Sequence, residues 1–377
     1  MMNPLPLRRD VLRLLSVALA AASLGAPAFA EGDSLRHGKI FTSTNSPAGN
    51  EVLVYNASET GAATLLTRVA TNGTGTGAGL GSQGAVTLSG DGRYLFVVNA
   101  ASNTVSTFAF GGAGMVLVSV VDSGGLTPTS VAENKGLLYV MNAGGSGNVA
   151  GFRNVRGVLT PLVDGSRGLS AAGGTAPAQV GFSSDGEVLV ISERNTNVLT
   201  SYAVRADGTL GSRVVTQSAG ITPFGFAFTR RDQLIVSEAQ AGATNGSTVS
   251  SYRFDNRAPT APLLVSRAVP TTQTAACWIA VTPDGRYAYS ANAGSSSISS
   301  FSVGVGGKLT LLQAAAGITG ANTGATDLAV TPDGQQLHIF ASRGLQISSF
   351  TVGSDGSLAP LGTVTGLPTG AAGIAVN

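Results

Sequence analysis

The chain has 377 residues, with 22 Lys and Arg against 20 Asp and Glu, and charged residues make up only 11% of it. Because charged residues are few and the two signs are nearly equal in number, the chain offers no basic surface for a phosphate backbone. This argues against nucleic acid as a partner. The single cysteine, Cys277, excludes an internal disulfide framework.

Residues 1–30 are typical of an export signal. A basic stretch at residues 8–13 precedes an apolar run at 14–22, and Ala28-Phe29-Ala30 forms a small-residue cleavage site. The apolar run is too short for a membrane-spanning helix, so we expect no membrane span. The paired arginines fit a twin-arginine signal, and the general secretory route stays open. We therefore expect a periplasmic or secreted protein whose folded part is residues 31–377.

A turn motif recurs about every 50 residues through the rest of the chain, which is the length of a propeller blade. Its clearest copies are AVTPDGRYAYSAN at residues 280–292 and AVTPDGQQLHIFA at residues 329–341. Weaker copies lie at 85–99 and 180–193. Repeats of this length that are built from short strands predict a β-propeller.

Each repeat contains four short segments that are rich in β-branched or aromatic residues. The third segment of one repeat, residues 297–303, alternates with period two, which indicates a strand. Pro283-Asp284-Gly285 supplies the first turn of that repeat, because Pro fixes φ and Gly accepts a positive φ. Six complete blades follow from this template, near 80–125, 126–175, 176–221, 222–274, 275–323 and 324–366.

A seventh blade is expected from the two ends of the chain. Residues 37–79 match the second and later strands of a blade but lack a first strand, whereas residues 370–377 match a first strand with nothing after it. Pairing the two ends would close the ring and remove open sheet edges. The predicted fold is therefore an all-β, seven-bladed propeller of four-stranded blades, closed by the C-terminal strand.

This pattern resembles the seven-bladed β-propeller lactonase family, which includes bacterial 6-phosphogluconolactonases and fungal carboxymuconate-lactonizing enzymes. The resemblance rests on the Thr-Pro-Asp-Gly-Arg-Tyr turn at 282–287 and on the Gly-x-Leu start of the fourth strand, as at 307–309. It implies lactone hydrolysis or formation, and Glu238 matches the glutamate of the family. The family also implies His and Arg at two first-strand starts, but Ala176-Pro-Ala-Gln179 and Pro223-Phe-Gly225 supply neither.

One position, at the end of the second strand, gives the main candidate site. Its residues would lie around the central opening, on the face opposite the Pro-Asp-Gly turns. Asn at this position has a structural explanation, because it tolerates the left-handed backbone at the end of a strand and both donates and accepts hydrogen bonds. Around the ring the position is occupied by Asn45, Asn99, Asn142, Glu193, Glu238, Asn292 and Ala341.

The two neighbouring glutamates permit three interpretations. In a concave site, Glu193 and Glu238 would repel each other and raise one pKa, as general acid–base catalysis requires. With Asn oxygens they could instead hold a Ca²⁺ or Mg²⁺ ion. They could also be solvated rim residues, or pair with Arg194 and a neighbouring cation.

The first-strand starts should face the same opening and contribute ligand contacts. They include Gln179, Phe224, Trp278, and Thr326 with Asp327. Trp278 could form a stacking wall for a ring-shaped ligand or belong to the core. The remaining expected ligand-binding residues are Asn99, Asn142, Asn292 and Arg194.

The other chemically notable residues have no expected role in catalysis. His338 lies within a second strand and His37 beside the expected mature N-terminus, so neither is placed for chemistry. Cys277 has no His near it in the template, and a buried apolar thiol explains it better than a nucleophile.

Two functions follow from these observations. The first is an exported lactonase-like enzyme that acts on a lactone or sugar-like small molecule at the central opening. The second is a non-enzymatic binding propeller for a carbohydrate, peptide or envelope partner. The retained Glu238 favours the first and the missing His and Arg favour the second, so enzyme status stays open. A monomer is expected.

Overall fold

The computed structural model describes residues 1–2, 38–111, 114–255 and 258–377. The expected export signal lies outside these residues, apart from Met1 and Met2, and so does His37. Within the described residues, 28 strands form seven four-stranded antiparallel sheets, and the one helical element is the 3₁₀ turn η2 (Gln240–Gly242). No helix in that part of the chain is long and apolar enough to cross a membrane. The seven-bladed prediction is confirmed.

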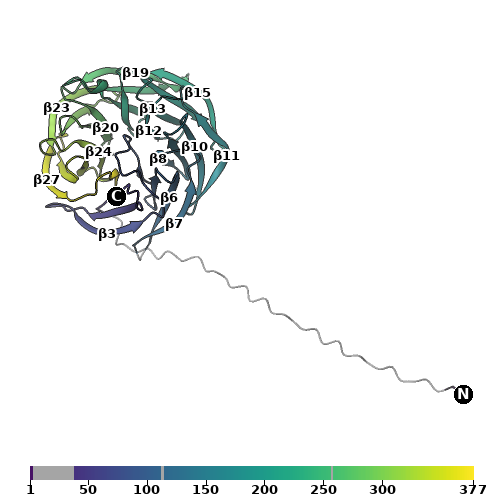
Figure 1. Cartoon of the computed structure of the whole chain (residues 1–377). Helices are drawn as coiled ribbons and strands as arrows, with labels where there is room; N and C mark the ends of the chain where they lie inside the picture. The colour runs from purple at the N-terminus through teal and green to yellow at the C-terminus, as the bar shows by residue number, and fades with distance from the viewer. Residues whose placement is uncertain (3–37, 112–113, 256–257) are drawn as a thin grey trace.

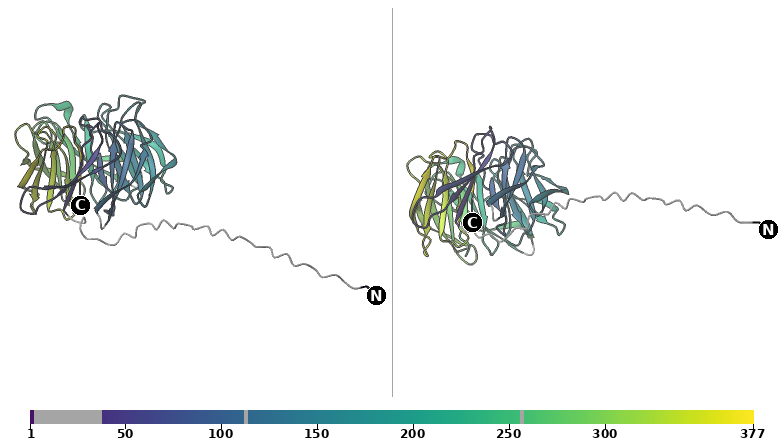
Figure 2. Two further views of the ribbon diagram at one scale, coloured as in Figure 1. Left: turned by 60° about the horizontal axis from the view of Figure 1, so that its bottom comes forward. Right: turned by 90° about the horizontal axis from the view of Figure 1, so that it is seen from below.

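The sheets surround a central axis, and each contributes its first strand to the centre (Figure 1). Figure 2 shows the ring from two further sides, with the strands running between its two faces. Blade 1 holds β28 (Ala372–Val376), β1 (Lys39–Ser43), β2 (Glu51–Asn56) and β3 (Thr64–Ala70). Blade 2 holds β4 (Val86–Leu88), β5 (Tyr94–Asn99), β6 (Thr104–Gly111) and β7 (Gly114–Asp122). Blade 3 holds β8 (Pro128–Asn134), β9 (Leu137–Asn142), β10 (Asn148–Val155) and β11 (Val158–Gly168).

The other four blades repeat this order from the axis outward. Blade 4 holds β12 (Pro177–Phe182), β13 (Val188–Glu193), β14 (Val198–Val204) and β15 (Leu210–Gln217). Blade 5 holds β16 (Pro223–Phe228), β17 (Gln233–Glu238), β18 (Thr248–Asp255) and β19 (Ala258–Pro270). Blade 6 holds β20 (Ala276–Val281), β21 (Tyr287–Asn292), β22 (Ser297–Val303) and β23 (Leu309–Ile318). Blade 7 holds β24 (Ala325–Val330), β25 (Gln336–Ala341), β26 (Gln346–Val352) and β27 (Leu358–Thr365).

The two ends of the chain close the ring in blade 1, as predicted. β28 pairs antiparallel with β1, with Phe41 opposite Ala375. Ser43 Oγ donates to the Ala372 carbonyl at 2.8 Å, and the Lys39 N–H donates to Asn377 Oδ1 at 3.0 Å. This pairing supplies the first strand that the N-terminal blade lacks and completes the ring.

The repeated turn motif has a local structural cause. In blade 6 the Asp284 carboxylate accepts hydrogen bonds from Thr282 Oγ1 at 2.6 Å and from the Arg286 N–H at 3.0 Å, while Gly285 adopts a φ of 71°. Asp333 accepts the same bond from Thr331 Oγ1 at 2.6 Å in blade 7. These side-chain bonds to nearby groups favour a tight turn between first and second strands. The motif therefore encodes the scaffold and no chemistry.

Candidate functional site

A short segment crosses the axis and closes the central channel. Residues 80–84, here the axial plug, lie between the first two blades in sequence. Gln83 Nε2 donates to the Ile279 carbonyl at 2.7 Å, and its Oε1 accepts from the Ile279 N–H at 3.1 Å, a contact 196 residues apart in sequence. The Gln83 N–H donates to the Ala178 carbonyl at 2.9 Å, and Trp278 Nε1 donates to the Ser82 carbonyl at 2.9 Å. The plug is therefore tied to the first strands of blades 4 and 6.

The plug fits because its neighbours are small. A Cβ at Gly225, on the first strand of blade 5, would lie 2.1 Å from Gln83 Oε1 and 2.7 Å from the Cys277 carbonyl oxygen. Ser82 Oγ also donates to the Thr129 carbonyl of blade 3 at 2.7 Å. The sequence analysis did not predict this course across the axis.

The predicted ring positions lie at the ends of the second strands, and all are buried, with at most 1% of each residue exposed. Their side chains reach the connections between one blade's outer strand and the next blade's first strand. In blade 3, for instance, Asn142 Nδ2 donates to the Ser123 carbonyl at 3.0 Å. Ala341 has no such group, and Gln346 Nε2 of the same blade donates to the Thr319 carbonyl at 2.6 Å instead.

Glu193 is enclosed by neutral donors. Its Oε1 accepts from the Ser170 N–H at 2.9 Å and from Thr200 Oγ1 at 2.6 Å. Its Oε2 accepts from Thr196 Oγ1 at 3.0 Å and from the Ser170 hydroxyl. Four donors thus satisfy a carboxylate that is 0% exposed.

Glu238 has a matching arrangement in the next blade. Its Oε1 accepts from the Gly220 N–H at 2.8 Å and from Ser218 Oγ at 3.2 Å, and its Oε2 accepts from Thr248 Oγ1 at 2.5 Å. Neither glutamate is exposed, so the interpretation as solvated rim residues is wrong. The two carboxylates share none of these partners, and each holds its own inter-blade connection.

The expected asparagines bind an inter-blade connection, as Asn99 does through Thr71, or the third strand of their own blade, as Asn292 does. Asn99 Oδ1 accepts from Thr71 Oγ1 at 2.7 Å and from Asn50 Nδ2 at 3.0 Å. Asn292 Nδ2 donates to Ser297 Oγ at 3.0 Å and to Ser299 Oγ at 2.9 Å. These amides are inside the protein rather than on a solvated face.

No protein metal centre is assembled from the commonest ligands. Within the part of the chain that the structure describes, no three His, Cys, Asp or Glu side chains come together in a geometry that could hold a metal ion. Glu193 and Glu238 as ligands of Ca²⁺ or Mg²⁺ would have to exchange their present donors for the ion.

Arg194 lies over an aromatic ring at the end of the channel opposite the turns. Its Cζ is 5.2 Å from the centroid of the Phe224 ring, and its Nε donates to the Ala176 carbonyl at 3.0 Å. It contacts neither predicted glutamate through an ion pair in the described residues, so that interpretation is wrong as well. Burial lowers the pKa of this guanidinium. The side chain stays partly exposed.

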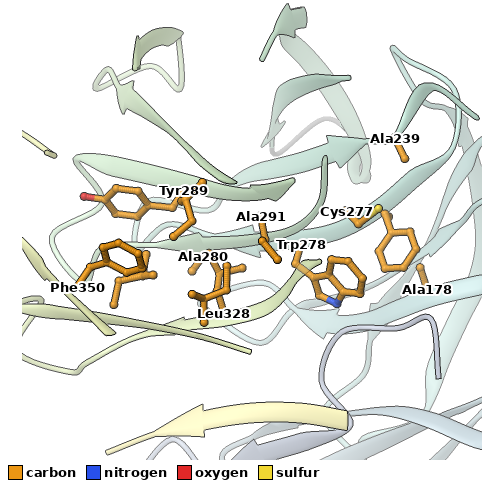
Figure 3. Close-up of a cluster of buried hydrophobic side chains, with 14 residues drawn as sticks. Ala178, Ala239, Cys277, Trp278, Ala280, Tyr289, Ala291, Leu328 and Phe350 are labelled. Carbon is orange, nitrogen blue, oxygen red and sulfur yellow. The ribbon is translucent and has the colours of Figure 1, made fainter. Parts of the chain in front are cut away.

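The aromatic residues beside Arg194 belong to a core cluster (Figure 3). The Phe224 and Trp278 rings have centroids 4.8 Å apart, and Trp278 is 8% exposed. Cys277 is buried next to them, and burial raises the pKa of its thiol to about 12, which confirms the prediction of an unreactive buried cysteine. Gln179 pairs its amide with the Phe226 backbone, donating to the carbonyl at 2.9 Å and accepting from the N–H at 2.6 Å.

A cavity of about 350 Å³, here the axial cavity, lies on the other side of the plug. It is an open cavity lined by the first strands of blades 2, 3, 4, 7 and 1 and by Gln83 and Gly84 of the plug. Its volume lies within the usual range for small-ligand sites, about 300–1,000 Å³.

Asp327 is the carboxylate that lines this cavity from blade 7. The Leu328 N–H donates to its Oδ1 at 3.0 Å, whereas its Oδ2 is buried without a hydrogen-bond partner in the structure. Burial raises its pKa to about 7, and the backbone N–H groups of Leu328, Ile374 and Gly84 oppose that rise. The sequence analysis placed Asp327 among the first-strand starts that face the opening opposite the turns, whereas in the structure it lines the axial cavity. A charge in the middle of an otherwise apolar first strand was the available signal.

His338 is also buried and lies away from the axis, as expected. Its Nδ1 is 2.8 Å from Ser349 Oγ, and its Nε2 has no partner. Burial lowers its pKa to about 4, so the ring is neutral at physiological pH. It has no acidic partner that would make it a catalytic base.

The comparison with protein families decides the affiliation of the chain. A family described as "Lactonase, 7-bladed beta-propeller" matches residues 163–261 and 247–372. The chain belongs to this lactonase family. A search of curated proteins found no match.

Solved structures show the same fold in several proteins. The periplasmic gluconolactonase PpgL of Pseudomonas aeruginosa superposes with a TM-score of 0.69 at 18% identity, over 88% of this chain and 98% of that one. A putative 6-phosphogluconolactonase from Bacteroides uniformis gives 0.65 at 18% identity, over 89% and 99%. A protein from Lactobacillus plantarum gives 0.70 at 17% identity, over 89% and 98%. Identities this low establish the fold, and the chemistry must be argued from residues.

Proposed function

We propose that this family member is an exported hydrolase of sugar-like lactones that works at the central opening on the Arg194 side of the plug. Family membership over residues 163–372 supports lactone chemistry, and the similar fold of a periplasmic gluconolactonase supports both the substrate class and the export. The export signal expected at residues 1–30 is consistent with that location.

The observation that carries the proposal is the state of Arg194. Its Nε is bonded to a backbone carbonyl, and within the described residues its two terminal amino groups have no hydrogen-bond partner. A planar guanidinium held over Phe224 is suited to bind a lactone carbonyl oxygen, or the carboxylate of the product, with two parallel N–H bonds. As charge develops on that oxygen during attack, the fixed cation stabilises it.

Hydrolysis also requires a base for the attacking water. The water loses a proton as its oxygen adds to the carbonyl, and the ring C–O bond then breaks to give a hydroxy acid. Glu238, which matches the family glutamate, and Glu193 are the proposed bases. Because each is enclosed by donors, either must first open the connection that it holds. Of the other expected ligand contacts, Trp278 lies beside Phe224 and Arg194 and would flank the opening, whereas Asn99, Asn142 and Asn292 are buried and Gln179 lines the axial cavity.

A binding propeller is the second candidate function. The plug closes the channel, and both glutamates have their hydrogen bonds satisfied, which suits a rigid platform for a carbohydrate, peptide or envelope partner. In this case the ligand would be held at the same Arg194 surface without turnover.

The test measures acid release at constant pH from aldono-, homoserine and muconolactones, with and without EDTA. We expect turnover that falls about 100-fold or more in Arg194→Ala, the usual loss for one oxyanion donor. Loss in Glu238→Gln or Glu193→Gln would identify the base, and sensitivity to EDTA would implicate a metal. Arg231→Ala is the matched control, because Arg231 is exposed in a turn on the opposite face. Turnover that Arg194→Ala leaves unchanged would refute the site, and no turnover on any lactone would favour the binding propeller.

A further inference from the structure

Another cavity lies on the face of the Pro-Asp-Gly turns, between the neighbouring blades 2 and 3 (Figure 1). This inter-blade cavity is open to solvent, and its volume of about 670 Å³ lies within the usual range for small-ligand sites, about 300–1,000 Å³. Its lining comes from the turns at 89–94, 133–136 and 154–157. Arg194 follows the end of a second strand and lies on the opposite face, so the two sites are separate.

Hydrogen bonds join these three turns to one another. The Asn154 N–H donates to the Gly136 carbonyl at 2.8 Å, which connects the two hairpin turns of blade 3. Glu133 Oε2 accepts from the Gly90 N–H of blade 2 at 2.9 Å, and its Oε1 accepts from the Gly136 N–H at 2.6 Å. The three turns therefore form one continuous surface across the boundary between the blades.

Both hairpin turns of blade 3 place a cation at this cavity in an unfavourable backbone conformation. Lys135 and Gly136 have φ values of 50° and 81°, and Arg156 and Gly157 have φ values of 55° and 87°. In two-residue turns of this kind Asn or Gly is preferred at the first position, because a positive φ brings the Cβ of other residues close to a carbonyl oxygen. Each turn has a long basic residue there instead. Such strain is typical of functional sites.

The carboxylates of the lining already have partners within the protein. Asp91 forms an ion pair with Arg93, with 2.7 Å between Oδ2 and Nε, and Glu133 is held by the two N–H groups described above. The lining contains three cations and two carboxylates, which leaves a net charge of +1. The cations that no carboxylate pairs with are Lys135 and Arg156.

The groups of the lining that lack a partner are mainly hydrogen-bond donors. Within the part of the chain that the structure describes, Arg156 has no hydrogen bond or ion pair, and Lys135 Nζ has one bond, to a backbone carbonyl at 3.2 Å. In the same residues, the side-chain amide of Asn134 and the hydroxyl of Tyr94 have no hydrogen-bond partner, and Asn154 uses only its Oδ1. Free donors and an excess of positive charge favour an anionic ligand that is rich in acceptor oxygens.

We propose that the inter-blade cavity binds a sugar acid of the hexuronate class, with its carboxylate at Arg156 and Lys135 and its ring hydroxyls at Asn134, Asn154 and Tyr94. A guanidinium binds a carboxylate through two parallel N–H bonds, and an ammonium group adds a point charge. The two amides and the phenol can donate and accept, as sugar hydroxyls require. A bare inorganic anion would use the cations alone and leave most of the cavity to water.

The experiment titrates D-glucuronate into the purified protein at low ionic strength and follows binding by calorimetry. Two matched ligands separate the contributions: D-glucose has the same ring with a hydroxymethyl group in place of the carboxylate, and acetate has the carboxylate without the ring. We expect saturable binding of glucuronate, and binding of glucose and of acetate that is weaker by about tenfold or more.

Substitutions by Asn test the two cations without disturbing their turns. Arg156→Asn and Lys135→Asn each remove one charge and supply the residue that the turn prefers, so the melting temperature should stay the same or rise. Each should weaken glucuronate binding by about tenfold. Arg230→Asn is the matched control, because Arg230 is exposed in a turn of blade 5 on the same face and does not line the cavity. It should leave the affinity unchanged.

Several results would overturn the proposal. These are equal binding of glucose, equal binding of acetate, unchanged affinity in both Asn variants, and no saturable binding of glucuronate. Acetate that binds as tightly as glucuronate would mean that exposed cations merely collect anions. Affinity that is lost in Arg194→Ala and kept in Arg156→Asn would place the sugar acid on the opposite face. None of these outcomes depends on lactone turnover.

Discussion

Glu193 and Glu238 are buried as deeply as Asp327, yet the fold surrounds these carboxylates differently. Four donors bind Glu193 and three bind Glu238, whereas Asp327 has one well-formed hydrogen bond and an oxygen without any. Their exposed fractions are 0%, 0% and 3%, so burial alone does not separate them. The difference teaches that the number of hydrogen bonds, and not burial alone, decides how well the fold stabilises a buried acid.

The position of each acid in its blade explains the contrast. The two glutamates lie at second-strand ends, where serine and threonine hydroxyls and N–H groups of the inter-blade connections converge on them. Asp327 lies on a first strand, where no side-chain hydroxyl reaches it and only backbone N–H groups of Leu328, Ile374 and Gly84 oppose the effect of burial.

The largest expected effect on unfolding free energy comes from removing one of the two buried glutamates. Glu193→Ala leaves the Ser170 N–H and three hydroxyls, of which that of Thr200 is fully buried, without their acceptor, and we expect unfolding free energy to fall by about 3–5 kcal/mol. Urea denaturation measures it, with Glu187→Ala on the exposed surface as a control that changes stability by less than about 0.5 kcal/mol. A loss below about 1 kcal/mol for Glu193→Ala would contradict its structural role.

The next effect is the pH dependence of stability. Asp327 has a folded-state pKa of about 7 against 3.8, so its contribution to stability falls as pH rises from about 4 to about 7, by up to about 4 kcal/mol. His338 has a folded-state pKa of about 4 against 6.5, so its contribution falls as pH drops through that interval. Between about pH 4.5 and 6.5, Asp327 therefore makes unfolding free energy fall with rising pH, whereas His338 makes it rise.

Single variants separate these two slopes. In Asp327→Asn, unfolding free energy should rise with pH between about 4.5 and 6.5, because the His338 term remains. In His338→Gln it should fall with pH over the same interval. The turn residues Asp91 and Asp284 have lowered pKa values and change protonation below this window. Identical slopes in both variants, measured by urea denaturation across pH, would show that neither group titrates as the structure implies.

The smallest expected effect concerns the plug that separates the two sides. Gln83→Ala removes both hydrogen bonds to Ile279 and should lower unfolding free energy by about 1–3 kcal/mol. Since Trp278 is the only tryptophan and donates to Ser82 of the plug, acrylamide should quench its fluorescence more in this variant. Gln217→Ala, on an exposed outer strand, is the control. Unchanged quenching would mean that the plug stays in place without Gln83.

The fold could be predicted because its determinants are local. The turn Asp, its hydroxyl partner and the following Gly lie within a few residues of one another, so this turn motif can be recognised in the sequence. The closing strand was predictable from a blade that lacked one strand and a C-terminal segment that matched it.

The candidate site was predicted only in part, because its contacts are long-range. The sequence placed Glu193 and Glu238 correctly at second-strand ends, but their donors Ser170 and Gly220 lie in connections that carry no repeat. The pairing of Gln83 with Ile279 across the axis had no local signal at all. For Asp327 the strand and the position were available, and the missing partner at Oδ2 became visible only when all seven blades were assembled.

The most direct test of the contrast between these acids is a pH titration of the Asp327 carboxyl carbon by ¹³C NMR, with Asp327→Asn used to assign the resonance. We predict a midpoint near pH 7, because burial favours the protonated form of this carboxyl group. A midpoint near 4 would contradict the account, since the carboxylate would then be as well stabilised by hydrogen bonds as the two glutamates are.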